Sequence, residues 1–243
     1  ILFLPAKRGY SRAFGSSQGG APASKKRRGM ARTATSKPKK FILGTTTRAT
    51  LRYSETITLT QAAVQGALGS YIFSANGAYD PNNSGAGGQP RGFDELLALY
   101  DHYTVVGSSI TCRYANQSPA NRPYVAIAVR DTNVNMADVK SVAEYGDKVM
   151  SARPLARTST GDNSGDANST ILTTKVNIAK FLGRKDALSD PELKGDSSRN
   201  PTEGVFYHVV AGDISSSSAG DVDVLVNITY DVILHEPRIP TSS

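Results

Sequence analysis

Basic side chains gather near the start of this 243-residue chain, and their characteristic chemistry is the neutralisation of phosphate groups. The stretch Lys25–Lys40 reads KKRRGMARTATSKPKK, in which eight of sixteen residues are basic and none is acidic. Thirteen bases precede Glu55, the first acidic residue, and we take them as the candidate nucleic-acid-binding residues: Lys7, Arg8, Arg12, Lys25, Lys26, Arg27, Arg28, Arg32, Lys37, Lys39, Lys40, Arg48 and Arg52. We expect them to bind by counterion release from phosphates, whatever the base sequence.

The basic segment has two competing interpretations. The cluster KKRR is typical of a nuclear localisation signal, which would make the nuclear import machinery a partner. One short cluster does not account for bases spread from Lys7 to Arg52, although both roles can coexist. A solubility tail is the second alternative, but solvated surfaces usually mix charges of both signs, and this segment does not.

The remainder of the chain has the opposite sign. The 28 lysines and arginines exceed the 21 aspartates and glutamates, which gives a net charge of +7. Beyond residue 54 there are 15 bases (28 − 13) against 21 acids, a net charge of −6. A cationic segment joined to an acidic body indicates two separate tasks, of which polyanion binding belongs to the segment.

Residues suited to catalysis or metal binding are scattered in the sequence. His102, His208 and His235 are expected on separate elements, without the paired spacing of a metal site. Asp221 and Asp223 share one face of an expected strand, where we expect a solvent- or interface-facing edge, with a calcium ion between subunits as the alternative.

Neither Cys112 nor the segment GDNSGD at 161–166 indicates a nucleophile. Cys112 lies in the alternating stretch SSITCRY, which predicts a small buried apolar side chain, and a single cysteine excludes an internal disulfide. GDNSGD resembles a protease loop only faintly, and we expect a polar surface loop. We therefore predict no catalytic residues, no metal site and no cofactor, so the chain is not expected to be an enzyme. No apolar run is long enough for membrane insertion.

Alternation with a period of two dominates the chain after residue 48 and predicts β-strands. The last segment has apolar residues at seven successive even positions: Val222, Val224, Val226, Ile228, Tyr230, Val232 and Leu234. Two short helices interrupt this pattern, in GFDELLALYDHY and in NMADVKSVAEYG. The loops are long and polar. Eight antiparallel strands in about 190 residues predict an all-β, two-sheet sandwich of jelly-roll type, with a β-barrel or an immunoglobulin-like sandwich as alternatives.

Several phrases of the body also carry a family resemblance. In order they are FDELLALYDHYTVVGSSI, KVNIAKFLGRKD, DPELKG, NPTEGVFYHVVAGD and DVDVLVNITYDVIL. Together they resemble capsid proteins of small circular, Rep-encoding single-stranded DNA viruses (the circovirus-like, or CRESS-DNA, group) over roughly residues 50–236. The most specific parts are YDHYTVVGS and NPTEGVFYHV.

The resemblance implies a single jelly roll with one helix between its second and third strands and one between its fourth and fifth. It places the strands near 49–60, 71–78, 104–115, 123–131, 149–157, 170–180, 204–211 and 222–235. We accordingly expect a basic, largely disordered arm at 1–48, a shell domain at 49–236 and a C-terminal tail at 237–243. It further implies an icosahedral T=1 virion of sixty self-assembled copies around single-stranded DNA, with assembly in the host nucleus and host nuclear import machinery as a partner.

Three other functions remain in competition. A capsid protein of a small RNA virus or satellite would have the same architecture, because nothing in the arm reads a 2′-hydroxyl. A cellular basic nucleic-acid-binding protein, such as a ribosomal protein, usually has positive charge over its body as well, and the net charge of −6 on this body disfavours that function. A jelly-roll lectin or enzyme would need a cluster of binding or catalytic residues, which the sequence pattern does not show.

Overall fold

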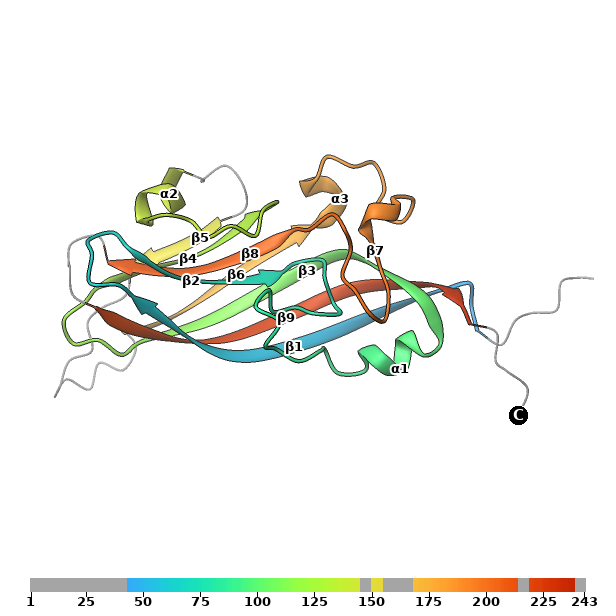
Figure 1. Ribbon diagram of the computed structural model, residues 1–243, viewed down its shortest axis with the longest axis horizontal. Helices are drawn as coiled ribbons and strands as arrows, with labels where there is room; N and C mark the ends of the chain where they lie inside the picture. The colour runs from blue at the N-terminus through green and yellow to red at the C-terminus, as the bar shows by residue number, and fades with distance from the viewer. Residues whose placement is uncertain (1–42, 145–149, 155–167, 214–218, 239–243) are drawn as a thin grey trace, which may run out of the picture. The chain divides into compact units, whose positions relative to one another are not determined.

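Figure 1 shows the computed structural model, in which two antiparallel β-sheets are stacked as layers. It describes residues 43–144, 150–154, 168–213 and 219–238, with the backbone alone for 150–154. The first sheet contains, in spatial order, β1 (Thr46–Gln61), β9 (Gly220–Pro237), β3 (Tyr100–Asn116) and β6 (Ser169–Asn177), with β7 (Lys194–Gly195) paired to β3. The second contains β2 (Leu68–Ser74), β8 (Phe206–Asp213), β4 (Pro123–Arg130) and β5 (Met150–Pro154).

The chain passes repeatedly from one sheet to the other, which is the jelly-roll arrangement. β1 and β2 lie in different sheets, β3 returns to the first, β4 and β5 belong to the second, and β6, β8 and β9 alternate again. The last strand, β9, lies between β1 and β3, and all the pairs are antiparallel. The predicted jelly roll of eight antiparallel strands is therefore confirmed in the described residues, with the two-residue β7 in addition.

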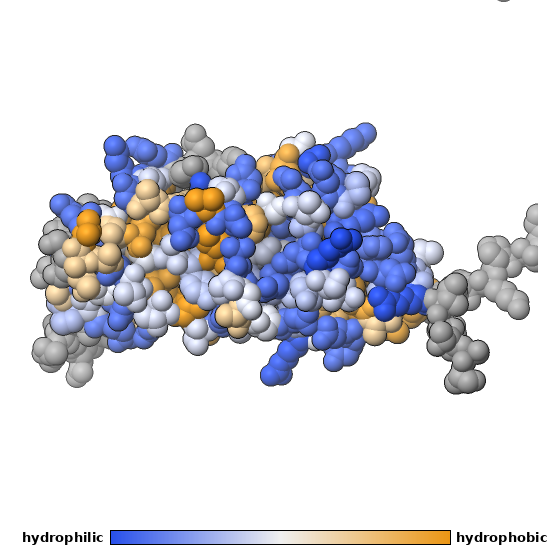
Figure 2. Space-filling view, in the orientation of Figure 1, coloured by the Kyte–Doolittle hydropathy of each residue, from blue (hydrophilic) through white to orange (hydrophobic). Residues whose placement is uncertain are grey.

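The predicted alternation of the last strand is confirmed in β9. Its even-numbered apolar side chains are at most 1% exposed: Val222, Val224, Val226, Ile228, Tyr230, Val232 and Leu234. The register places Leu51 of β1 opposite Tyr230 and Ile57 opposite Val224, so the buried faces of the two strands coincide. These faces pack against β4 and β8 across the sandwich, and the apolar area removed from water stabilises the sheet pair. Hydrophilic residues cover much of the face in Figure 2, with hydrophobic patches between them.

Both predicted helices are present in the predicted connections. α1 (Phe93–Leu97) lies between β2 and β3, and α2 (Val139–Glu144) lies between β4 and β5. Each buries two of the apolar side chains that its spacing places on one face: Phe93 and Leu97 in α1, Val139 and Val142 in α2. No helix of the described residues has the length and apolar character needed to cross a membrane.

The predicted strand at 170–180 is wrong at its end. β6 stops at Asn177, whose side-chain oxygen accepts a hydrogen bond of 2.9 Å from the backbone N–H of Lys180. This bond caps a helical turn, α3 (Ile178–Phe181), so local side-chain capping replaces continued strand pairing. A 3-10 turn, η1 (Pro191–Leu193), was not predicted either.

Other strand limits differ from prediction by a few residues. β1 begins at Thr46, three residues before the predicted start. β2 spans Leu68–Ser74 rather than 71–78, because the chain turns after Ser74. The hydroxyl oxygen of Ser74 accepts a hydrogen bond of 2.8 Å from the backbone N–H of Gly77, which closes that turn.

Candidate functional site

Two of the thirteen candidate nucleic-acid-binding residues, Arg48 and Arg52, lie in the described part of the chain. Both are on the exposed face of β1, because alternate side chains of a strand point to the same side. The other eleven lie outside the described residues: Lys7, Arg8, Arg12, Lys25, Lys26, Arg27, Arg28, Arg32, Lys37, Lys39 and Lys40. Phosphate binding by all thirteen stays a prediction.

Arg48 is engaged by a carboxylate of the neighbouring strand. Its guanidinium donates two hydrogen bonds to the carboxylate of Asp231 in β9, one of them from Nε to Oδ1 at 2.7 Å. The side chain of Arg48 is 69% exposed, so this pair lies at the surface. The positive charge of Arg48 is therefore already paired with the negative charge of Asp231.

Charges of both signs alternate over the exposed face of the first sheet. One hollow of this face is lined by Arg113 and Asp223, and another by Arg48, Lys175 and Asp231. A surface that binds polyanions by charge alone needs an excess of bases. On the described part of this face, the bases Arg48, Arg52, Arg113 and Lys175 exceed the acids Asp221, Asp223 and Asp231 by only one. Most of the positive charge of the chain therefore lies in the segment that precedes β1.

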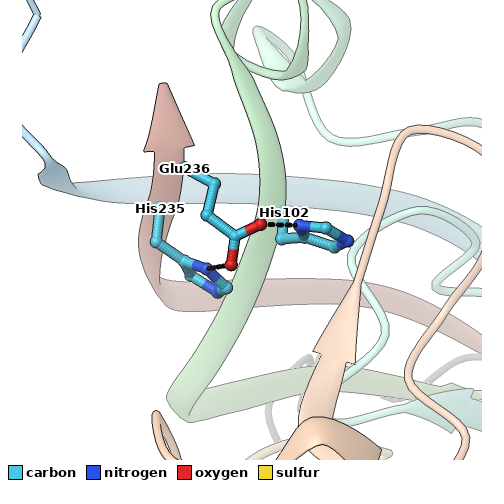
Figure 3. A group of neighbouring side chains, drawn as sticks. All are labelled: His102, His235 and Glu236. Carbon is cyan, nitrogen blue, oxygen red and sulfur yellow. Dashed lines mark hydrogen bonds and ion pairs between the residues drawn. The ribbon is translucent and has the colours of Figure 1, made fainter. Parts of the chain in front are cut away.

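A second candidate site lies at the end of the first sheet, where β3 pairs with β9. The register sets His102 directly opposite His235, and Glu236 follows His235 in β9. Figure 3 shows the carboxylate of Glu236 between the two imidazole rings. Its Oε2 lies 2.8 Å from Nδ1 of His102, and its Oε1 lies 3.6 Å from Nδ1 of His235. Among the described residues, these three form a group in which one nitrogen or oxygen atom from each residue lies within 4.8 Å of the other two.

The surroundings of this group set its charge. The two rings are stacked, with centroids 5.8 Å apart and an angle of 16° between their planes. Desolvation lowers the pKa of His235, and the positive charge of Lys194 lowers it further. Desolvation alone would raise the pKa of Glu236, but His102, Lys194 and His235 together lower it. The group therefore holds a carboxylate beside a neutral His235 near pH 7.

The expectation that the three histidines stand apart is wrong for His102 and His235. They are 133 positions apart in sequence, and only the insertion of β9 beside β3 makes them neighbours. No local motif marks such a pair. The two histidines can be recognised as neighbours only when it is known that β3 pairs with β9 and in which register.

The remaining candidate residues behave mostly as expected. Cys112 is fully buried, and desolvation raises the pKa of its thiol to about 12, which confirms the prediction of an inert apolar residue. Asp221 and Asp223 are on the exposed face of β9, where Asp223 accepts a hydrogen bond of 2.8 Å from the hydroxyl of Thr58. The segment GDNSGD lies outside the described residues.

His208 is a buried histidine of the second sheet. Its Nε2 lies 2.8 Å from the backbone oxygen of Thr132, and the residue is 0% exposed. Desolvation lowers its pKa from the ordinary 6.5 to about 4, because a charged imidazole is costly in this apolar environment. The folded chain thus keeps His208 neutral at pH values where the unfolded chain protonates it.

We expect His208 to make the folded state less stable in mild acid. Between pH 6.5 and 4 the unfolded chain binds a proton that the folded chain does not, so stability falls as the pH falls through this window. The full shift corresponds to a loss of up to about 3 kcal/mol. Urea unfolding of the unassembled chain at pH 7 and pH 4.5 measures it. His208→Gln should reduce the pH dependence by this amount, and an identical dependence in the variant would contradict the assignment.

Comparisons with known proteins gave structural matches alone. A scan against protein families found no match. A search of curated proteins found none either. Among solved structures, a semi-empty virus-like particle of the giant freshwater prawn Macrobrachium rosenbergii nodavirus is similar, with 13% identity and a TM-score of 0.42. The match covers 91% of this chain and 97% of that chain.

Two further solved structures match at a similar level. Mud crab tombus-like virus has 13% identity and a TM-score of 0.40, with 95% of this chain and 96% of that chain covered. Desmodium yellow mottle tymovirus has 13% identity and a TM-score of 0.37, with 80% and 93% covered.

Proposed function

We propose that this chain is a viral capsid protein. Its jelly-roll body assembles with copies of itself into a closed icosahedral shell, and its basic N-terminal segment binds a single-stranded DNA genome inside. The observation that carries the proposal is the separation of charge: thirteen bases and no acid in residues 1–54, joined to a body of net charge −6. A body that repels polyanions needs a separate segment to hold them.

The body has a surface suited to contacts with copies of itself. Its described part leaves six large apolar side chains at least 37% exposed: Val64, Leu99, Val134, Ile171, Leu188 and Leu225. Leu225 of β9 and Ile171 of β6 lie on either side of Arg113 of β3, in register across the first sheet. Arginine beside apolar side chains is a composition enriched in protein interfaces. Subunit contacts would remove these side chains from water.

The charge of the basic segment matches the scale of a small genome. Sixty copies bring 60 × 13 = 780 positive charges, which neutralise on the order of 800 nucleotides directly. A genome of roughly one to two thousand nucleotides leaves the remainder to small cations and to residues of the body.

DNA is the proposed polymer because the sequence phrases resemble capsid proteins of circular single-stranded DNA viruses. A small RNA virus is the alternative, since charge neutralisation does not distinguish the two polymers. KKRR gives the same chain a segment for nuclear import, which fits a genome that is replicated in a host nucleus.

Electron microscopy of the purified full chain tests the proposal. We expect uniform closed shells at low salt in the presence of single-stranded DNA. The nucleic acid released from shells isolated from infected material should be sensitive to DNase and resistant to RNase. The opposite sensitivity would replace DNA by RNA and keep the capsid proposal. Absence of shells with either polymer, over a range of salt and pH, would contradict it.

A further inference from the structure

We propose that His102, His235 and Glu236 form a binding site for a divalent transition-metal ion of the Zn²⁺ class. The site ties β3 to β9 at the end of the first sheet where β1 begins, since His235 is also the register partner of Thr46. This inference does not depend on the capsid proposal, because it rests on three side chains within one sheet.

The donor atoms are of the right type and nearly at the right spacing. Two imidazole nitrogens and one carboxylate oxygen are a common ligand set for Zn²⁺, with water in the remaining position. Bonds of about 2.0–2.1 Å in a tetrahedron place the donors ~3.3 Å apart. Oε2 of Glu236 lies 2.8 Å from Nδ1 of His102 and its Oε1 lies 3.6 Å from Nδ1 of His235, and one donor atom from each residue lies within 4.8 Å of the other two. Metal binding requires side-chain rotations that bring these donors to the tetrahedral spacing.

A buried hydroxyl orients one of the rings. Oγ1 of Thr104 lies 3.1 Å from Nε2 of His235, and Thr104 is 0% exposed. With the Nε2 proton donated to Thr104, the lone pair of Nδ1 points toward Glu236. A second partner that fixes the tautomer of a histidine in this way is the usual support of a metal ligand. A lowered pKa of His235 also favours the neutral imidazole that binds metal.

The backbone at Glu236 brings the carboxylate into the group. Glu236 has a φ of 63° and is the one non-glycine residue with a positive φ among the described residues. Adjacent residues of a regular strand point to opposite faces, whereas here Glu236 joins the residue that precedes it. The left-handed conformation costs a non-glycine residue about 1 kcal/mol or more. A glycine at this position would avoid this cost. A role for the carboxylate of Glu236 would explain why the position holds glutamate instead.

Lys194 opposes metal binding and so provides a test. Its Nζ lies 3.6 Å from Oε1 of Glu236, where its ammonium supplies a positive charge to the carboxylate. A bound cation would take over this role and repel the lysine. Removing the charge of Lys194 should therefore raise the metal affinity by roughly fivefold.

Metal titration of the full chain, treated first with a chelator, tests the site. We expect Co²⁺ to give visible absorption bands of a low-symmetry N/O site at one ion per chain, and Zn²⁺ to displace it in calorimetry. His102→Ala and Glu236→Gln should each weaken binding more than about 100-fold, because outer-shell partners alone are worth about 10- to 100-fold. Lys194→Gln should bind more tightly. His208→Gln is the matched control and should bind as the unmodified chain does.

A further variant separates binding from folding. Glu236→Gly removes the carboxylate and at the same time relieves the left-handed backbone, so it should fold at least as stably and still lose the metal. Binding of Zn²⁺ by His102→Ala and Glu236→Gly with unchanged affinity would overturn the proposal. So would the absence of Zn²⁺ and Co²⁺ binding by the unmodified chain at millimolar metal.

Discussion

A chain that lacks residues 1–40 will assemble but will protect about sixfold less nucleic acid than the full chain. The deletion removes eleven of the thirteen bases and leaves Arg48 and Arg52. If protected length follows the number of neutralised phosphates, two thirteenths of the charge hold about one sixth of the nucleotides. Arg48 already pairs with Asp231, which weakens the remainder further. The amount of nuclease-resistant nucleic acid per protein chain measures the effect.

A matched variant distinguishes charge from chain length. In a full-length chain, the eleven bases of residues 1–40 are replaced by glutamine, which keeps the length and the polarity. We expect this variant to protect as little nucleic acid as the deletion. Binding of a single-stranded oligonucleotide should also lose most of its salt dependence, whose slope follows the number of phosphates contacted. Protection equal to that of the full chain in either variant would show that the body holds the genome, contrary to our proposal.

Replacing Tyr103 by alanine will destabilise the body by about 3–5 kcal/mol, the usual cost of removing a buried aromatic side chain. Tyr103 is fully buried in β3, and its ring meets that of Phe93 edge-on with centroids 5.4 Å apart. Its hydroxyl accepts hydrogen bonds of 3.2 Å from the backbone N–H groups of Ala78 and Tyr79. It therefore joins β3, α1 and the segment that follows β2.

Two smaller changes at the same place separate the ring from the hydroxyl. Tyr103→Phe keeps the ring and leaves the backbone N–H of Ala78 without this acceptor, which should cost about 1–3 kcal/mol. Gly195→Ala adds a methyl group that would meet the Tyr103 ring at 2.4 Å, so a similar loss is expected from overpacking. Urea unfolding of unassembled protein measures all three variants. A loss of less than 1 kcal/mol in the free energy of unfolding for Tyr103→Ala would show that the contacts of Tyr103 contribute little to stability.

The strands with one buried face could be predicted from the sequence because every second side chain of such a strand is buried and therefore apolar. In β9, seven successive even positions are apolar and all seven are buried. The end of β6 could not be predicted in the same way. Ile178 continues the apolar alternation of that strand and is itself buried, but the Asn177 cap turns the chain into α3. Periodicity does not distinguish a buried residue of a strand from one of a helical turn.

The two candidate sites differ in the same respect. The basic segment is visible in the sequence because its thirteen bases are close together along the chain. The group formed by His102, His235 and Glu236 depends on a pairing between distant strands, and a shift of one residue would send His235 to the other face. The backbone conformation that brings Glu236 beside His235 also has no signature in residue type, since glycine rather than glutamate is the residue expected there.

The particle mass of the purified full chain tests most directly whether this body is built to assemble around nucleic acid. One chain weighs 25.8 kDa, so sixty copies contribute a protein mass of about 1.5 MDa, with additional mass from the enclosed nucleic acid. We predict a single dominant species of at least this mass when single-stranded DNA is present at low salt. A chain that stays at 25.8 kDa under all conditions, with and without nucleic acid, would contradict the central claim.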